Sequence, residues 1–162
     1  MEVMIRNAVS SDCERIRPLQ LEIAALHHYG RPDLFQNVPK YWTQQDFDAK
    51  LANREHLVLI AEENGMIVGY MFAWVQHIRN HPVYYDFDNF YIDDICVAES
   101  HRRRGIGRML FERCKAHAKA LGCQRMDLGV YAFNQDAIAF YESMGMTERM
   151  RKMEYHLEEE TE

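Results

Sequence analysis

The stretch best suited to chemistry is the basic run Arg102–Gly107, which reads Arg-Arg-Arg-Gly-Ile-Gly. The apolar residues at positions 92–97 favour a strand before it. From Ile106 onward, apolar residues recur at three- and four-residue steps, which is typical of a helix. A helix that begins just after Gly105 points its free backbone N–H groups and its positive dipole end into the turn. Because glycine lets the backbone approach an anion closely and arginine adds charge, the run predicts a pyrophosphate site.

A solvated surface is the alternative interpretation of the same run. Three consecutive arginines are also typical of an exposed face, and Gly-x-Gly is a weak signal by itself. The chain contains neither the complete Gly-x-Gly-x-x-Gly fingerprint nor the Gly-Lys-Ser/Thr of a P-loop. Local chemistry alone leaves both interpretations open.

A second stretch of interest runs from Asn134 to Met146. Asn134 suits the N-cap of a helix, and Gly145 suits its end. Tyr141 follows Phe140 in this helix, and an aromatic pair of this kind is often amphipathic core. The residues alone therefore indicate a capped helix with a buried aromatic face.

Together the two stretches resemble the GNAT superfamily of acyl-CoA-dependent N-acetyltransferases. Arg102–Gly107 matches that family's Arg/Gln-x-x-Gly-x-Gly/Ala motif. Asn134 is followed seven positions later by Tyr141 and then by Gly145, which is similar to the family's second signature. The order and separation of the two motifs are far more specific than either motif alone. The resemblance spans most of the chain and is strongest from 67 to 155.

The resemblance implies how acetyl-CoA would bind. In such proteins the pantetheine arm follows the strand before the arginine-rich turn, at a gap where two parallel strands splay apart. The pyrophosphate lies on the turn, and the asparagine of the second signature helps to hold the cofactor. The implied cofactor-binding residues are Ile95, Cys96, Val97, Arg102, Arg103, Arg104, Gly105, Ile106, Gly107, Arg108 and Asn134.

The resemblance also implies catalytic roles. Tyr141 is the candidate general acid for the departing CoA thiolate, since a tyrosine with a pKa near about 10 stays protonated at neutral pH. The amine must also lose a proton. Ribosomal-protein alanine N-acetyltransferases carry a glutamate base at the position that Gly129 occupies here, so that assignment is not available.

Asp93 and Asp94 offer a replacement base. The run Tyr91–Asp94 is similar to the Tyr-Leu-Glu-Asp before the cofactor strand of spermidine/spermine N-acetyltransferases. Adjacent strand residues face opposite ways, and in an unbroken strand Asp93 shares a face with Ile95, so Asp93 is favoured. A bulge would change that parity. The alternative is that one of the two carboxylates is simply solvent-exposed, and we infer no polyamine specificity from them.

His27 and His28 lie near the end of the first expected helix, where acceptor pockets of this family are commonly built. Either side chain is a candidate for substrate contact. A surface histidine on a helix is the alternative.

Composition bounds the class of protein. The 162 residues suit one domain, which we expect over 1–157 with an acidic tail at 158–162. The net charge of −6 favours a cationic acceptor and argues against general nucleic-acid binding. The sequence shows no signal peptide, no run of membrane-spanning length, no Cys-x-x-Cys pair and no metal-ligand spacing. We therefore expect a cytoplasmic protein with reduced thiols, no metal and no membrane partner.

The fold expected is a single α/β domain with a mixed sheet and helices on both faces. Its N-terminal strands are antiparallel, and a central parallel pair splays apart. The elements expected in order are a strand at 3–8, a helix from about 13 to 30, a helix from Thr43 to about 53, strands at 56–61 and 66–75, a central strand ending at 97, a helix at 106–120, a strand at 125–130, a helix at 134–145, and a last strand or hairpin at 146–157.

These expectations predict an acetyl-CoA-dependent N-acetyltransferase that acts on a primary amine by direct attack. The acceptor is a small molecule or a peptide, and the sequence leaves both open. A non-catalytic acyl-CoA-binding or regulatory domain is the alternative, because Gly129 replaces the usual base. Since members of the family often pair, the resemblance also implies a homodimer.

Overall fold

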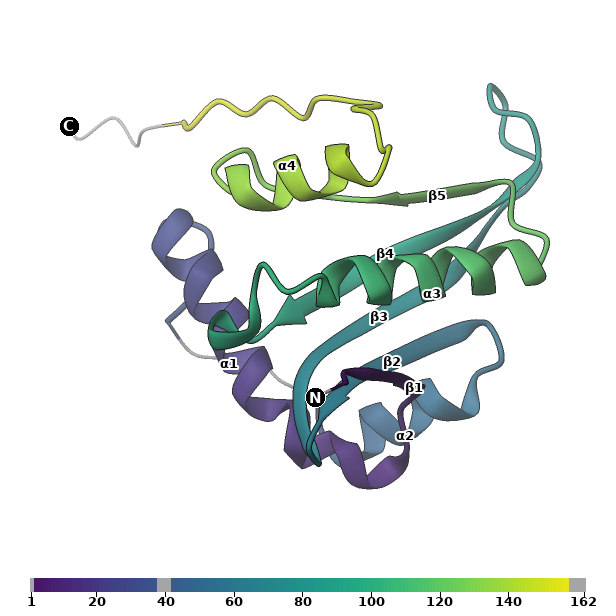
Figure 1. Ribbon diagram of the computed structural model, residues 1–162. Helices are drawn as coiled ribbons and strands as arrows, with labels where there is room; N and C mark the ends of the chain where they lie inside the picture. Colours follow the sequence, from purple (N-terminus) through teal and green to yellow (C-terminus); the bar gives the residue numbers. More distant parts are fainter. Residues whose placement is uncertain (1, 38–41, 158–162) are drawn as a thin grey trace.

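The computed structural model describes residues 2–37 and 42–157. A five-stranded sheet with the strand order β1-β2-β3-β4-β5 forms its centre, and all neighbouring strands are antiparallel except the parallel pair β4 and β5. Figure 1 shows α3 across one face of the sheet and α1 and α2 across the other. The elements are β1 (Met4–Asn7), a 3-10 turn (Ser10–Asp12), α1 (Cys13–Gly30), α2 (Gln44–Ala52), β2 (His56–Glu63), β3 (Met66–Ile78), β4 (Phe87–Val97), a second 3-10 turn (Glu99–His101), α3 (Ile106–Ala120), β5 (Arg125–Leu128) and α4 (Gln135–Ser143).

Alternation along β3 divides the core into two layers. Met71 and Ala73 pack toward α3, whereas Tyr70 and Phe72 pack toward α1 and α2. Such alternation is the period-two pattern of a strand buried on both faces. The mixed sheet with helices on both faces is confirmed.

Local signals explain several boundaries. Thr43 caps α2, and its hydroxyl accepts a hydrogen bond from the Asp46 amide at 3.1 Å. Asn64 and Gly65 both have positive φ, of 52° and 77°, which is the conformation that a two-residue hairpin turn requires. The predicted cap and the predicted turn between β2 and β3 are both confirmed.

The parallel strands β4 and β5 separate partway along. Their register runs from Asn89 opposite Arg125 to Ile92 opposite Leu128, where β5 ends. β4 continues to Val97, so its last residues have no partner strand on the β5 side. The backbone of β4 is therefore open to a ligand at this edge.

A bulge interrupts β4 just after the last pair with β5. Phe72 lies opposite Asp94 and Ala73 lies opposite Ile92, so Asp93 is an extra residue without a partner on β3. An inserted residue bends a strand and increases its twist. The bulge thus coincides with the point where β4 turns away from β5.

The last expected strand is the one element that was wrong. Residues 146–157 are extended but belong to no helix or strand. Figure 1 shows this segment, which we call the C-terminal arm, running along the outer side of α4. Ion pairs hold it at two points, from Arg149 to Asp127 at 2.8 Å and from Glu154 to Arg31 at 2.5 Å. A strand needs a neighbour to pair its backbone, and none of the described strands lies beside the arm.

The expected acidic tail at 158–162 and part of the loop before Thr43 lie outside the described residues. No helix within the described ranges is long and apolar enough to cross a membrane.

Candidate active site

A cavity of about 550 Å³ opens where β4 leaves β5. Its walls come from α1, the end of β4, the start of α3, and α4. The predicted catalytic residues Tyr141, Asp93 and Asp94 all line it. The predicted cofactor-binding residues that line it are Ile95, Cys96, Val97, Arg102, Arg103, Gly105, Ile106, Gly107, Arg108 and Asn134.

Arg104 is the predicted residue that does not line the cavity. Its guanidinium binds both carboxylate oxygens of Glu63, at 2.5 and 3.1 Å. This pairing lowers the pKa of Glu63 and ties the turn to the end of β2. The side chain of Arg104 therefore braces the turn from outside.

The turn before α3 has the shape of an anion site. Arg103 and Gly105 adopt left-handed conformations, with φ of 62° and 81°, and Gly105 is the N-cap of α3. Left-handed residues beside a helix start direct successive backbone N–H groups into one concavity. A Cβ on Gly105 would meet no atom within 4 Å, so glycine is required there for its φ and not for space.

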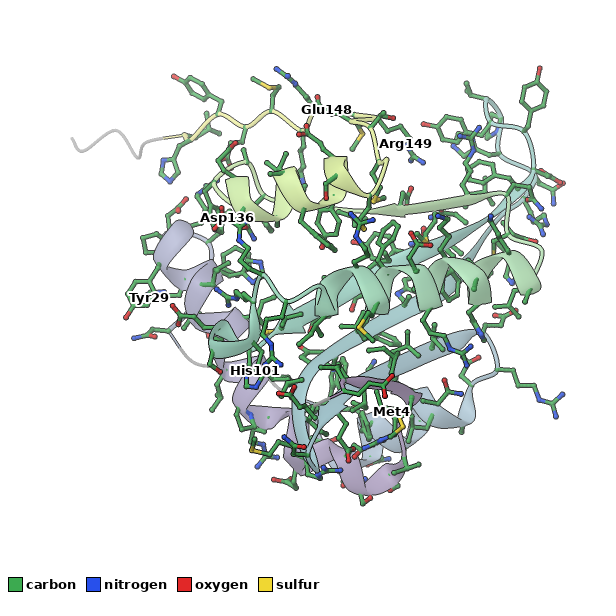
Figure 2. The ribbon with its side chains drawn as sticks, in the orientation of Figure 1. Met4, Tyr29, His101, Asp136, Glu148 and Arg149 are labelled. Atoms are coloured by element: carbon green, nitrogen blue, oxygen red, sulfur yellow. The ribbon has the colours of Figure 1, made fainter. Side chains whose placement is uncertain are left out.

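The arginine side chains spread in different directions from this turn. Arg102 donates to Glu22 at 2.5 Å and to the Val97 carbonyl at 3.1 Å, which joins the turn to α1 and to the end of β4. Arg103 is 90% exposed and lies 3.9 Å from Asp136. Figure 2 shows Asp136 at the start of α4, facing the side where His101 precedes α3. Arg103 therefore remains available to a ligand at the mouth of the cavity.

Gly107 allows α4 to approach α3. A Cβ at this position would lie 3.2 Å from the ring of Phe140, which is tighter than ordinary contact. Phe140 also packs edge-to-face against Phe111 of α3. The second glycine of the motif therefore serves helix packing as well as the cavity wall.

α4 brings Asn134 and Tyr141 to the cavity. The Asn134 side chain accepts a hydrogen bond from the Ala137 amide at 3.2 Å, so it is the predicted N-cap. Tyr141 lies two turns further along on the cavity side. Burial, together with the nearby charge of Asp94, raises the pKa of Tyr141 well above its usual value, so its hydroxyl stays protonated at neutral pH.

Asp94 is the more buried of the two adjacent carboxylates. Tyr70, which is fully buried on β3, donates a short hydrogen bond to Asp94 Oδ2. Burial raises the pKa of Asp94 to about 6, and the negative charge of Asp93 adds to this, while the Tyr70 hydrogen bond opposes it. A carboxylate with a pKa near neutrality is suited to exchange protons.

Asp93 is exposed at the bulge. Its side chain forms no hydrogen bond or ion pair with any residue in the described ranges, although it lines the cavity. The face-sharing argument that favoured Asp93 assumed an unbroken strand, and the bulge removes that assumption. The pairing and burial of Asp94 had no signal in the sequence, because they depend on Tyr70 from another strand.

Gly129 leaves space for Tyr91. A Cβ on Gly129 would lie 3.7 Å from the Tyr91 hydroxyl, and the two residues share a hydrogen bond through the Gly129 backbone. The tyrosine hydroxyl thus lies beside the position at which a glutamate side chain would begin.

His27 lies in an aromatic cluster and not on an open surface. Its ring stacks on Phe35 with centroids 5.0 Å apart and lies 5.9 Å from Tyr131. Burial lowers the pKa of His27, so the ring is neutral near pH 7. His27 and Tyr131 both line the cavity, whereas His28 bonds the Phe35 carbonyl at 2.7 Å and does not.

Sequence reasoning missed several other cavity residues, namely Ile23, Leu26, Val130, Tyr131, Asp136, Ala137, Phe140 and Met144. They come from α1, from the loop after β5 and from α4. No local pattern marks them, since tertiary packing alone brings these segments together. Within the described ranges, no group of three or more His, Cys, Asp or Glu side chains is arranged to hold a metal ion.

Comparison with known proteins agrees with this geometry. Residues 23–146 match the model of the acetyltransferase (GNAT) family. The crystal structure of the BH1408 protein from Bacillus halodurans is 32% identical, with a TM-score of 0.89, and the match covers 95% of this chain and 99% of that one. The aminoglycoside N-acetyltransferase AAC(6')-Iy, solved in complex with CoA, is 19% identical, with a TM-score of 0.72 over 96% of this chain and 99% of that one.

A curated relative adds a named activity. The L-ornithine N5-acetyltransferase NATA1 of Arabidopsis thaliana is 39% identical over 73 residues, which are 45% of this chain. The match spans 32% of the length of the Arabidopsis protein.

Proposed function

Because the chain belongs to the GNAT family of acetyltransferases, we propose that it transfers the acetyl group of acetyl-CoA to a primary amine. One observation carries the proposal. A single cavity combines an amide-lined turn, the unpaired edge of β4, a buried carboxylate and a protonated tyrosine.

The residues present suit the acyl donor. The turn from Arg103 to Gly107 offers backbone N–H groups and the helix dipole to a pyrophosphate. The free edge of β4 from Ile95 to Val97 offers backbone hydrogen bonds to the amides of the pantetheine arm. Bound acetyl-CoA supplies an activated thioester at the inner end of this path.

Asp94 and Tyr141 divide the proton transfers. Asp94 accepts a proton from the ammonium, directly or through water, so that the neutral nitrogen attacks the carbonyl carbon. The N–C bond forms and the C–S bond breaks, and Tyr141 donates its proton to the sulfur that leaves. The unpaired carboxylate of Asp93 at the cavity wall attracts the cationic acceptor.

The acceptor is a primary amine carried by a small molecule or a peptide. The named activity of the Arabidopsis relative makes ornithine the first compound to test. Incubation with acetyl-CoA and a panel of ornithine, lysine, diamines and peptides, with detection of free thiol, tests the proposal. Release of CoA that requires one acceptor class supports it, and release no faster than the background hydrolysis with every acceptor contradicts it.

A non-catalytic acyl-CoA-binding domain is the second candidate, favoured by Gly129 at the position of a family base. It predicts tight binding of acetyl-CoA in calorimetry without turnover. Loss of turnover in Tyr141→Phe with retained binding excludes this candidate.

The C-terminal arm supports a homodimer as the working assembly. Met153, Tyr155 and Leu157 are 84%, 87% and 82% exposed, and they alternate with Lys152, Glu154 and His156 as in a strand with one apolar face. Apolar surface of this kind marks a contact site. Exchange of the arms between two copies buries this face and gives a symmetric interface.

Light scattering on the full chain tests the assembly. We expect a dimer at micromolar concentration and a monomer in the double variant Met153→Glu/Tyr155→Lys. The matched control is Val83→Glu/Tyr85→Lys, in the β3–β4 hairpin, where both side chains are similarly exposed. A monomeric parent protein, or a control that dissociates equally, contradicts the role of the arm.

A further inference from the structure

Tyr70 is a buried polar side chain for which the reaction outlined above leaves no role. It lies in the middle of β3 and is fully buried against α1 and α2. A buried hydroxyl needs a hydrogen-bond partner, and it finds one in Asp94. An apolar residue would fill the same place in the core without this requirement.

The register of the sheet explains why the two side chains meet. Tyr70 lies directly opposite Cys96, so Asp94 is its diagonal neighbour on the same face of the sheet. A diagonal pair is within reach of a tyrosine ring. Since Asp93 is the extra residue of the bulge, it is Asp94 that takes the regular position facing Tyr70.

We propose that Tyr70 is a positioning residue that holds the Asp94 carboxylate toward the acceptor nitrogen and stabilises its ionised form. This inference rests on the proposed function. The hydrogen bond fixes one carboxylate oxygen, Oδ2, and leaves the other free to accept the proton of the amine. It also orients the carboxylate before the acceptor enters.

The groups around Asp94 act in opposite directions. Tyr70 from β3 and the Ile95 backbone amide favour the ionised form, while burial and the charge of Asp93 favour the protonated form. Cys96 on the same face and Tyr141 from α4 feel the charge of Asp94, and burial raises the pKa of both. From α1, His27 lines the same cavity and is neutral. No cation in this set pairs with Asp94, so Tyr70 is the side chain that stabilises its charge.

Tyr70→Phe tests the inference, because it removes only the hydroxyl. Carbon-13 NMR of the aspartate carboxyl groups, with Asp94→Asn for assignment, follows the titration of Asp94 directly. We expect the midpoint to rise by about one pH unit, since a hydrogen bond to a charged group is worth about 1.5–3 kcal/mol. The acidic limb of the pH profile of kcat/KM then moves by the same amount, while the affinity for acetyl-CoA changes less than about twofold.

Tyr85→Phe is the matched control, since Tyr85 is 93% exposed on the hairpin far from the cavity. It changes neither the NMR midpoint nor the pH profile. An unchanged Asp94 midpoint in Tyr70→Phe overturns the inference, and so does a moved midpoint with an unmoved acidic limb. An absence of turnover in the parent protein counts against the proposed function alone, and the NMR titration still decides whether Tyr70 stabilises the Asp94 carboxylate.

Discussion

The two ends of the cavity are built in different ways. The end formed by the turn comes from one continuous stretch, 102–108, and uses mainly backbone N–H groups. The end with the acid and base collects side chains from β3, β4, α1 and α4. A backbone site is specified by a local motif, whereas a side-chain site depends on the register and packing of distant segments. The two ends therefore differ in which substitutions they tolerate.

The largest effect is expected from Tyr141→Phe. Loss of the proton donor lowers kcat by about 10²–10⁴-fold. The affinity for acetyl-CoA stays within about twofold, because backbone groups at the other end carry the binding. Thiol release and calorimetry on the same preparation measure both quantities, and a parallel loss of affinity and rate would merge the two ends into one.

Asp94→Asn is expected to lower turnover about 100-fold and to raise thermal stability. Burial raises the pKa of Asp94 from 3.8 to about 6, so the folded state binds the proton more tightly than the unfolded state. Stability contributed by this group is thus present below pH 4 and is lost as pH rises to 6. Above pH 6, asparagine avoids a buried charge, and we expect the melting temperature to rise by a few degrees in calorimetry.

The parent enzyme has a matching pH dependence. Since Asp94 accepts a proton only when ionised, kcat/KM falls as pH falls through about 6. An acidic limb near pH 4, the range of an exposed carboxylate, would instead indicate Asp93 as the base.

Gly105→Ala tests the backbone end. A non-glycine residue at a φ of 81° costs about 1–2 kcal/mol, so relaxation of the turn should weaken acetyl-CoA binding about tenfold. Gly65→Ala is the matched control, since Gly65 has a φ of 77° and likewise no atom within 4 Å of an added Cβ. Equal affinity in the two variants would show that the turn does not bind the donor.

The smallest effects are expected from the arginine side chains. Arg103→Ala should weaken acetyl-CoA binding up to about fivefold, since an exposed charge contributes about 1 kcal/mol or less. Arg104→Ala should leave the affinity within about twofold and lower the melting temperature, because it removes the main partner of buried Glu63. Calorimetry at two salt concentrations separates these contributions, and a larger loss for Arg104 would contradict its placement outside the cavity.

The elements of the fold were predictable wherever a local rule determines them. Hydrophobic spacing marks α3, the Thr43 cap marks α2, and Asn64-Gly65 marks the first hairpin. The last strand was not predictable in this way. Its alternation of apolar and polar residues is present in the arm, but a strand also needs an edge to pair with, and no such edge is encoded in 146–157 itself.

The candidate site divides along the same line. The turn and Asn134 follow from contiguous residues, so their positions at the cavity could be predicted. The direction of the Arg104 side chain depends on Glu63, which lies 41 positions earlier in the chain. The pairing of Asp94 with Tyr70 and the enclosure of His27 by Phe35 and Tyr131 likewise arise only in the folded molecule.

The bulge at Asp93 also bears on how such a cavity can be gained or lost. Because Asp93 is the one unpaired residue, a chain lacking it keeps every other cross-strand neighbour on β3 and the facing of every side chain from Asp94 onward. What such a chain loses is the local bend that carries β4 away from β5. A deletion of one codon would therefore yield a protein that still folds but has its two parallel strands closed together, with no opening left for a thioester.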